Sequence, residues 1–91
     1  MPLGEAAKKV PGGKLVRVKI DFEGELLKSV QITGDFFMHP EEGLEILEKS
    51  LQEIRFDEIE KKVDEVLNAH DLMLVGVSAA DLSEVINSAR T

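Results

Sequence analysis

The chain of 91 residues has no cysteine, and its 18 acidic and 11 basic residues give a net charge of −7. Without thiols it can form neither disulfides nor thiolate metal sites, and cysteine catalysis is excluded. Two distant histidines, His39 and His70, do not make a structural zinc site, so we expect no metal. The acidic balance argues against general nucleic-acid binding.

Residues 1–9 lack the apolar run of a signal peptide, and no stretch is long enough to cross a bilayer. We therefore expect a soluble, cytoplasmic protein without a membrane partner. The same segment shows no clear period, so we interpret it as a flexible leader in front of a single domain over residues 10–91.

Two strands are predicted first. Residues 11–13 form a Pro-Gly-Gly turn, and the residues that follow alternate with period two. A second alternating run covers residues 26–33, and the short connection predicts an antiparallel hairpin. Lys28 falls on the apolar phase of that run, which indicates either a β-bulge or a position at the rim of the sheet. The apolar faces are Val16, Val18, Ile20 and Phe22 on the first strand, and Val30 and Ile32 on the second.

Helical spacing predominates after residue 40. A first stripe of apolar residues at helical spacing predicts a helix that begins near Pro40 and continues to Ile54. A proline suits the first position of a helix. The motif Asp57-x-x-Glu60 predicts a capping box for a second helix, and Ser78-x-x-Asp81 predicts one for a third. The expected buried stripes are Leu44, Leu47, Leu51 and Ile54, then Ile59, Val63, Val66 and Leu67, and last Leu82, Val85, Ile86 and Ala89.

The apolar segment from Asp71 to Val77 is short and interrupted by Gly76. It is either a loop that enters the core or a brief third strand, and we favour the loop. The sequence thus predicts an α+β fold, in which an antiparallel β-hairpin, with or without a short third strand, is followed by about three helices packed on one sheet face.

The joint from Gly34 to Gly43 holds two of the four aromatic residues of the chain. Asp35 could act as a base or bind a cation, but a structural role at the corner is favoured. His39 could be an acid-base group, but a polar residue before Pro40 is typical of a helix cap. Whether Phe36 or Phe37 is exposed stays open, because adjacent side chains diverge. We assign no catalytic residue to this chain.

Two strings, residues 9–18 (KVPGGKLVRV) and 29–37 (SVQITGDFF), resemble the C-terminal accessory domain of lipoate-protein ligases. The resemblance extends from about Lys8 to Ile86, with Gly34-Asp35-Phe36-Phe37 as its sharpest motif. It implies a small α+β domain that, in archaeal two-component ligases, is a separate subunit. It further implies a non-catalytic role: the catalytic subunit needs this partner, in a heterodimer, to activate lipoate to lipoyl-adenylate. ATP and lipoate are then expected on the partner, and no cofactor on this chain.

Lipoyl carrier domains are thus expected as indirect partners. The alternative is a binding module whose basic strand face docks an acidic lipoyl carrier domain without any ligase role, in a complex that salt weakens. The candidates for the partner interface are Lys14, Arg17, Lys19, Asp35, Phe36, Phe37 and His39.

Overall fold

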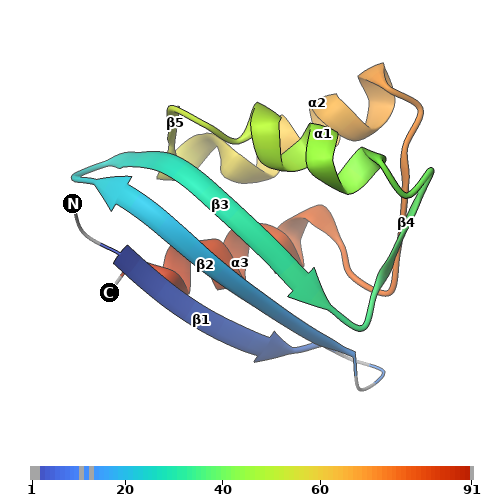
Figure 1. The fold of residues 1–91 in the computed structure, drawn as a ribbon, viewed down its shortest axis with the longest axis horizontal. Helices are drawn as coiled ribbons and strands as arrows, with labels where there is room; N and C mark the ends of the chain where they lie inside the picture. The colour runs from blue at the N-terminus through green and yellow to red at the C-terminus, as the bar shows by residue number, and fades with distance from the viewer. Residues whose placement is uncertain (1–2, 11, 13, 91) are drawn as a thin grey trace.

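A four-stranded antiparallel sheet with the order β1-β2-β3-β5 forms one layer of the computed structural model, which describes residues 3–10, 12 and 14–90 (Figure 1). Three helices form the other layer, and a separate two-stranded sheet pairs β4 with β6. The predicted α+β class is confirmed, with more strands than expected. The elements are β1 (Leu3–Lys9), β2 (Leu15–Glu23), β3 (Leu26–Gly34), β4 (Phe37–His39), α1 (Gly43–Ser50), β5 (Ile54–Arg55), the 3₁₀ helix η1 (Phe56–Glu58), α2 (Ile59–Ala69), β6 (Met73–Val75) and α3 (Ala79–Ala89).

Residues 3–9 form an edge strand and are not a flexible leader. β1 pairs antiparallel with β2 along its whole length, from Leu3 opposite Asp21 to Lys9 opposite Leu15. The sequence signal is weak because the inward positions hold Gly4, Ala6 and Lys8, two residues too small to mark an apolar face and one that is charged. Residues 1 and 2 of the expected leader lie outside the described residues.

The β2–β3 hairpin forms as predicted, and its register resolves the ambiguity at Lys28. Asp21 pairs with Ser29, whereas the next residue, Phe22, pairs with Leu27. Lys28 is therefore the extra residue of a β-bulge, which lets β3 stay in phase with its apolar face inward. In the predicted turn before β2, Gly12 adopts a φ of +97°; Pro11 and Gly13 lie outside the described residues.

Helix α1 is shorter than predicted at both ends. A turn closed by a 2.9 Å hydrogen bond from the Gly43 N–H to the Pro40 carbonyl delays its start. At the other end Glu53 adopts a φ of +59°, outside the helical region, and the chain turns back. Ile54 then pairs with β3 as part of β5, so its expected place on the helix is wrong.

One predicted capping box is confirmed and one is wrong. At α3 the Ser78 Oγ accepts from the Asp81 N–H at 3.1 Å, and the Ser78 N–H donates to Asp81 Oδ2 at 3.0 Å. At α2 the N-cap is Glu58, whose side chain makes no capping hydrogen bond. Asp57 instead pairs with Arg55, whose guanidinium lies 3.2 Å away.

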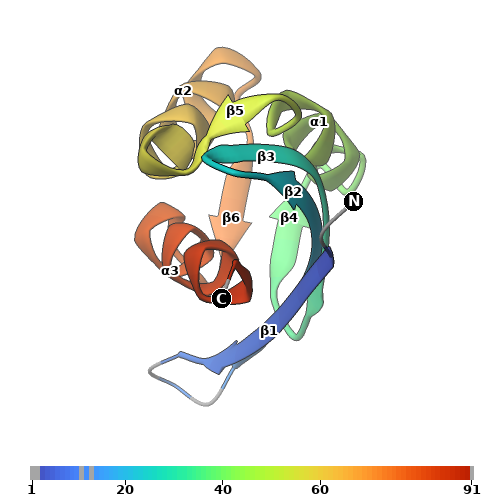
Figure 2. The same cartoon turned by 90° about the vertical axis from the view of Figure 1, so that its left-hand side faces the viewer.

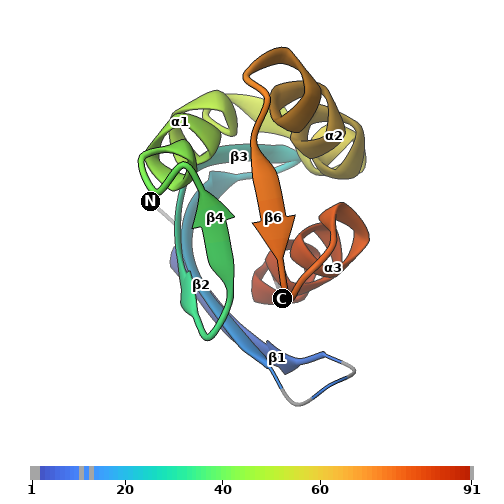
Figure 3. The same cartoon turned by 90° about the vertical axis from the view of Figure 1, so that its right-hand side faces the viewer.

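The segment predicted as a loop contains strand β6. Its three residues pair with β4, and Figure 3 shows these two strands side by side in front of the helices. The expectation of a loop fails because the partner strand lies inside the joint after β3, where the sequence indicated only a corner.

Helix α3 packs on β1 and β2, α1 packs on β3, and α2 packs on both other helices (Figure 2). At the edge of β3 that faces away from β2, the Ile32 N–H donates to Glu48 Oε2 on α1 at 2.7 Å. Helix α1 thereby covers an edge whose backbone groups would otherwise be free to pair with another chain. Among the described residues, no helix is long and apolar enough to span a membrane.

Candidate functional site

The sharpest motif of the sequence begins at a corner that requires glycine. Gly34 ends β3 with a φ of +153°, and the N–H of Asp35 donates to the Leu15 carbonyl at 2.9 Å. A Cβ atom on Gly34 would lie 2.1 Å from that same oxygen. The chain can therefore leave the sheet and begin β4 only because this position has no side chain.

The two phenyl rings after this corner point in different directions. Phe36 is half-buried and packs against the core, and a Cβ on Gly76 would lie 3.4 Å from the Phe36 Cβ. The next residue, Phe37, is 62% exposed. The question that the sequence left open is thus answered: one ring helps to fix the corner, and the other is presented to solvent.

The structure does not bring Asp35 and His39 together. Asp35 lines a hollow of about 500 Å³ with Lys14 and Phe36, whereas His39 lines another, of about 600 Å³, with Asp64. Both side chains are exposed. His39 is not a helix cap either, because it ends β4 and α1 begins only at Gly43. Among the described residues, no three potential metal ligands lie together.

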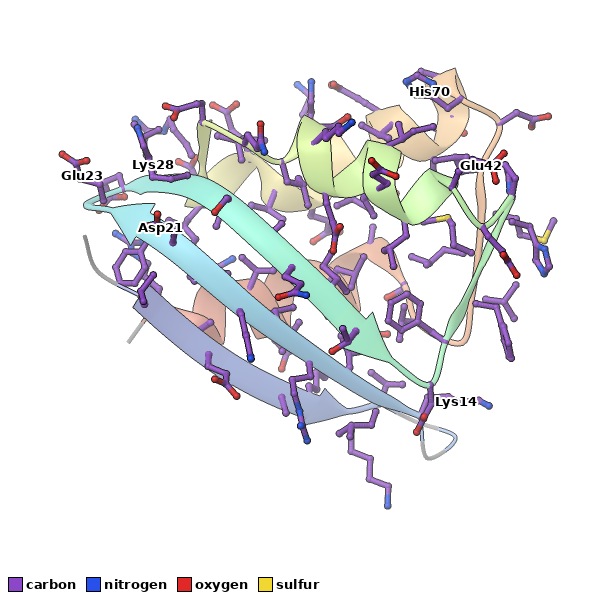
Figure 4. All side chains as sticks on the ribbon, viewed as in Figure 1. Lys14, Asp21, Glu23, Lys28, Glu42 and His70 are labelled. Carbon is purple, nitrogen blue, oxygen red and sulfur yellow. The ribbon has the colours of Figure 1, made fainter. Side chains whose placement is uncertain are left out.

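The basic candidates divide between two surfaces. Arg17 and Lys19 are exposed on the outer face of the sheet, where they lie opposite Ala7 and Glu5 of β1. Lys14 lies apart from them, at the end of the sheet where β3 passes into β4 (Figure 4). The seven candidate residues therefore do not form one continuous site.

Sequence reasoning missed two residues of the surface around Phe37. Met73 is 63% exposed and Val75 is 41% exposed, and both lie on β6 beside β4. The only available signal was the short apolar run before Gly76, which we interpreted as a loop. Because apolar residues occupy both faces of this run, the period-two pattern that would have marked a strand is absent.

Comparison with known proteins shows the family to which the chain belongs. A family model for the C-terminus of bacterial lipoate protein ligase matches residues 5–87. The chain belongs to the lipoate-protein ligase C-terminal domain family. Membership agrees with the resemblance carried by the two strings around the β1–β2 turn and the Gly34 corner.

The similar curated protein and the similar solved structure both come from Thermoplasma acidophilum. Lipoate-protein ligase A subunit 2 is 31% identical over 72 residues, which are 79% of this chain and 76% of the relative. A chain from the structure of an archaeal lipoylation system, a bi-partite lipoate protein ligase and its E2 lipoyl domain, superposes with a TM-score of 0.74 and 28% identity. The superposition covers 94% of this chain and 93% of that one.

Proposed function

We propose that this chain is the accessory subunit of a two-component lipoate-protein ligase. The observation that carries the proposal is the agreement over almost the full lengths of both chains with a protein of a bi-partite ligase. The curated relative, named as subunit 2 of such a ligase, supports the same role. The chain would act in the cytoplasm as one half of a heterodimer, and the enzyme is the complex.

In this proposal the chemistry belongs to the catalytic subunit. ATP and lipoate bind there, lipoyl-adenylate forms there, and a lysine of a lipoyl carrier domain is the final acceptor. The accessory subunit favours the conformation of its partner that is competent for adenylation. A partner can shift such an equilibrium only by as much as its affinity differs between the two conformations, so the accessory subunit must bind the competent conformation more tightly.

The proposal is tested by adenylation itself, which is reversible and can be followed as exchange of labelled pyrophosphate into ATP. With lipoate present, we expect little exchange by the catalytic subunit alone and strong exchange after an equimolar amount of this chain is added. A mixture without lipoate is the control, because it removes the substrate and leaves the complex intact. Equal exchange with and without this chain would show that it has no accessory role.

A further inference from the structure

The ribbon formed by β4 and β6 has one buried and one exposed face. Its central pair, Met38 and Leu74, packs into the core, and Met38 is only 6% exposed. The flanking pairs point the other way, because successive side chains of a strand alternate between its faces. The flanking pairs are Phe37 with Val75 and His39 with Met73. We call the three apolar side chains among them, Phe37, Met73 and Val75, the ribbon face.

The ribbon face concentrates the exposed apolar surface of the molecule. Among the described residues, four large apolar side chains are exposed, and three of them form this face. The fourth, Leu3, lies at the other end of the sheet, opposite Asp21. Single exposed apolar residues are normal, but a contiguous group that contains an aromatic ring is typical of a protein–protein contact.

Charged side chains of both signs surround the ribbon face. Lys14 and Asp35 line the hollow beside Phe37, and Glu41 lines a second hollow that Phe37 also borders. The ammonium group of Lys14 makes no ion pair with a carboxylate of the described residues, so a partner can supply one.

At the Met73 end, Asp64 and Asp71 line the hollow next to His39 and likewise make no ion pair with a described residue. A complementary surface would therefore be apolar at its centre, with a carboxylate placed to pair with Lys14 and basic groups placed to pair with the two aspartates.

We propose that the ribbon face binds the catalytic subunit of the ligase. The inference rests on the proposed function and adds the place of contact. An apolar centre with a charged rim suits a lasting interface between subunits. A carrier domain that docks only briefly is better served by exposed charges such as Arg17 and Lys19 on the outer sheet face.

The test compares two variants that remove exposed apolar surface at different places. The double variant Phe37→Ala, Met73→Ala should bind the purified catalytic subunit at least about tenfold more weakly by calorimetry, because aromatic anchors dominate interface energies. The matched control is Leu3→Ala, which should bind as the wild type does. Since all three side chains are exposed, the thermal transitions of both variants should match that of the wild type.

A charge reversal tests the rim independently. Lys14→Glu should weaken binding most at low ionic strength, where the attraction between Lys14 and an acidic surface is least screened. Lys61→Glu, an exposed lysine on α2, is the control and should leave affinity unchanged.

The outcomes separate the two proposals. If the wild-type chain neither binds the catalytic subunit nor restores exchange, the proposed function and this inference both fail. If the wild type does both and the double variant binds as tightly as Leu3→Ala, the ribbon face is not the interface, while the function stands. If light scattering shows that the free wild-type chain is a dimer and the double variant a monomer, the ribbon face binds a second copy of the chain and the inference is overturned. It is also overturned if the double variant loses binding to the carrier domain and keeps binding to the catalytic subunit.

Discussion

At the residue scale, Gly4 shows how a missing side chain determines packing. A Cβ on Gly4 would lie 1.8 Å from the carbonyl oxygen of Ala89 near the end of α3. Helix and strand thus approach until backbone meets backbone, and Ala89, 1% exposed, completes the contact. Because Gly4 has no side chain, it contributes no apolar signal from which β1 could be predicted, and for the same reason α3 can pack closely on the strand.

Gly4→Ala should therefore lower the free energy of unfolding by about 1–3 kcal/mol, because α3 must shift or the backbone must strain. Urea denaturation followed by circular dichroism measures the effect. Glu5→Ala changes the exposed neighbour on the same strand and should stay within about 0.5 kcal/mol of the wild type. Equal stability of the two variants would show that α3 does not lie so close to β1.

At the element scale, the start of α3 combines a cap with an ion pair. The Asp81 carboxylate accepts from the Ser78 N–H, and the Lys8 ammonium lies 3.2 Å from its Oδ1. The pKa of Asp81 is lowered, first by the backbone hydrogen bond from Ser78 and further by Lys8. The pKa of Lys8 is raised, chiefly by its hydrogen bond with Glu84.

This arrangement predicts a dependence of stability on pH. Because the pKa of Asp81 is lower in the folded than in the unfolded chain, its contribution is complete above the ordinary value of 3.8 and is lost as the pH falls through the folded pKa. Asp81→Asn removes the charge near the helix N-terminus and keeps an oxygen that can accept from Ser78, so it should cost about 0.3–1 kcal/mol at neutral pH, and the difference from the wild type should shrink in acid. Asp64→Asn, on the exposed side of α2, is the control. A difference that stays constant down to pH 2 would contradict this assignment.

At the scale of the whole molecule, the first strand and the last helix pack against each other. β1 lies against α3, with Lys8 bridging to Asp81 and, at 2.5 Å, to Glu84. At the other end of α3, the Arg90 guanidinium lies 2.6 Å from Glu25 and 4.7 Å from the centre of the Phe56 ring. The first and last elements are thus parts of one core, although more than 70 residues separate them along the chain.

Removing residues 1–9 should consequently abolish cooperative thermal unfolding, because a small domain has only about 5–15 kcal/mol of stability and the deletion exposes the covered face of α3. Calorimetry of the truncated chain provides the measurement. The double variant Glu5→Ser, Lys9→Ser keeps β1 and changes only outward positions, so it should unfold as the wild type does. A truncated chain with an unchanged transition would restore the interpretation of this segment as a flexible leader.

Local patterns were sufficient for much of the fold. The alternation from Val16 to Phe22 predicted β2, and the Ser78 capping box with the stripe through Leu82 predicted α3, because both signals depend on residues close in the chain. The Gly34 corner was also visible, since a glycine followed by two aromatic residues stands out in a chain with so few rings. Where local signals were weak or shared, as at Asp57 and Ile54, the predictions were wrong.

By itself, the sequence determined the hairpin, the last helix, the α+β class and the resemblance to a ligase accessory domain. Only the tertiary structure decided that residues 3–9 form an edge strand, that the segment before Gly76 pairs with the strand after Gly34, and that Phe37 is exposed beside Met73 and Val75. Each of these depends on pairing between segments far apart in the chain. A strand of three residues gains its backbone partners and its buried side only from such pairing, so its own residues carry too little signal to predict it.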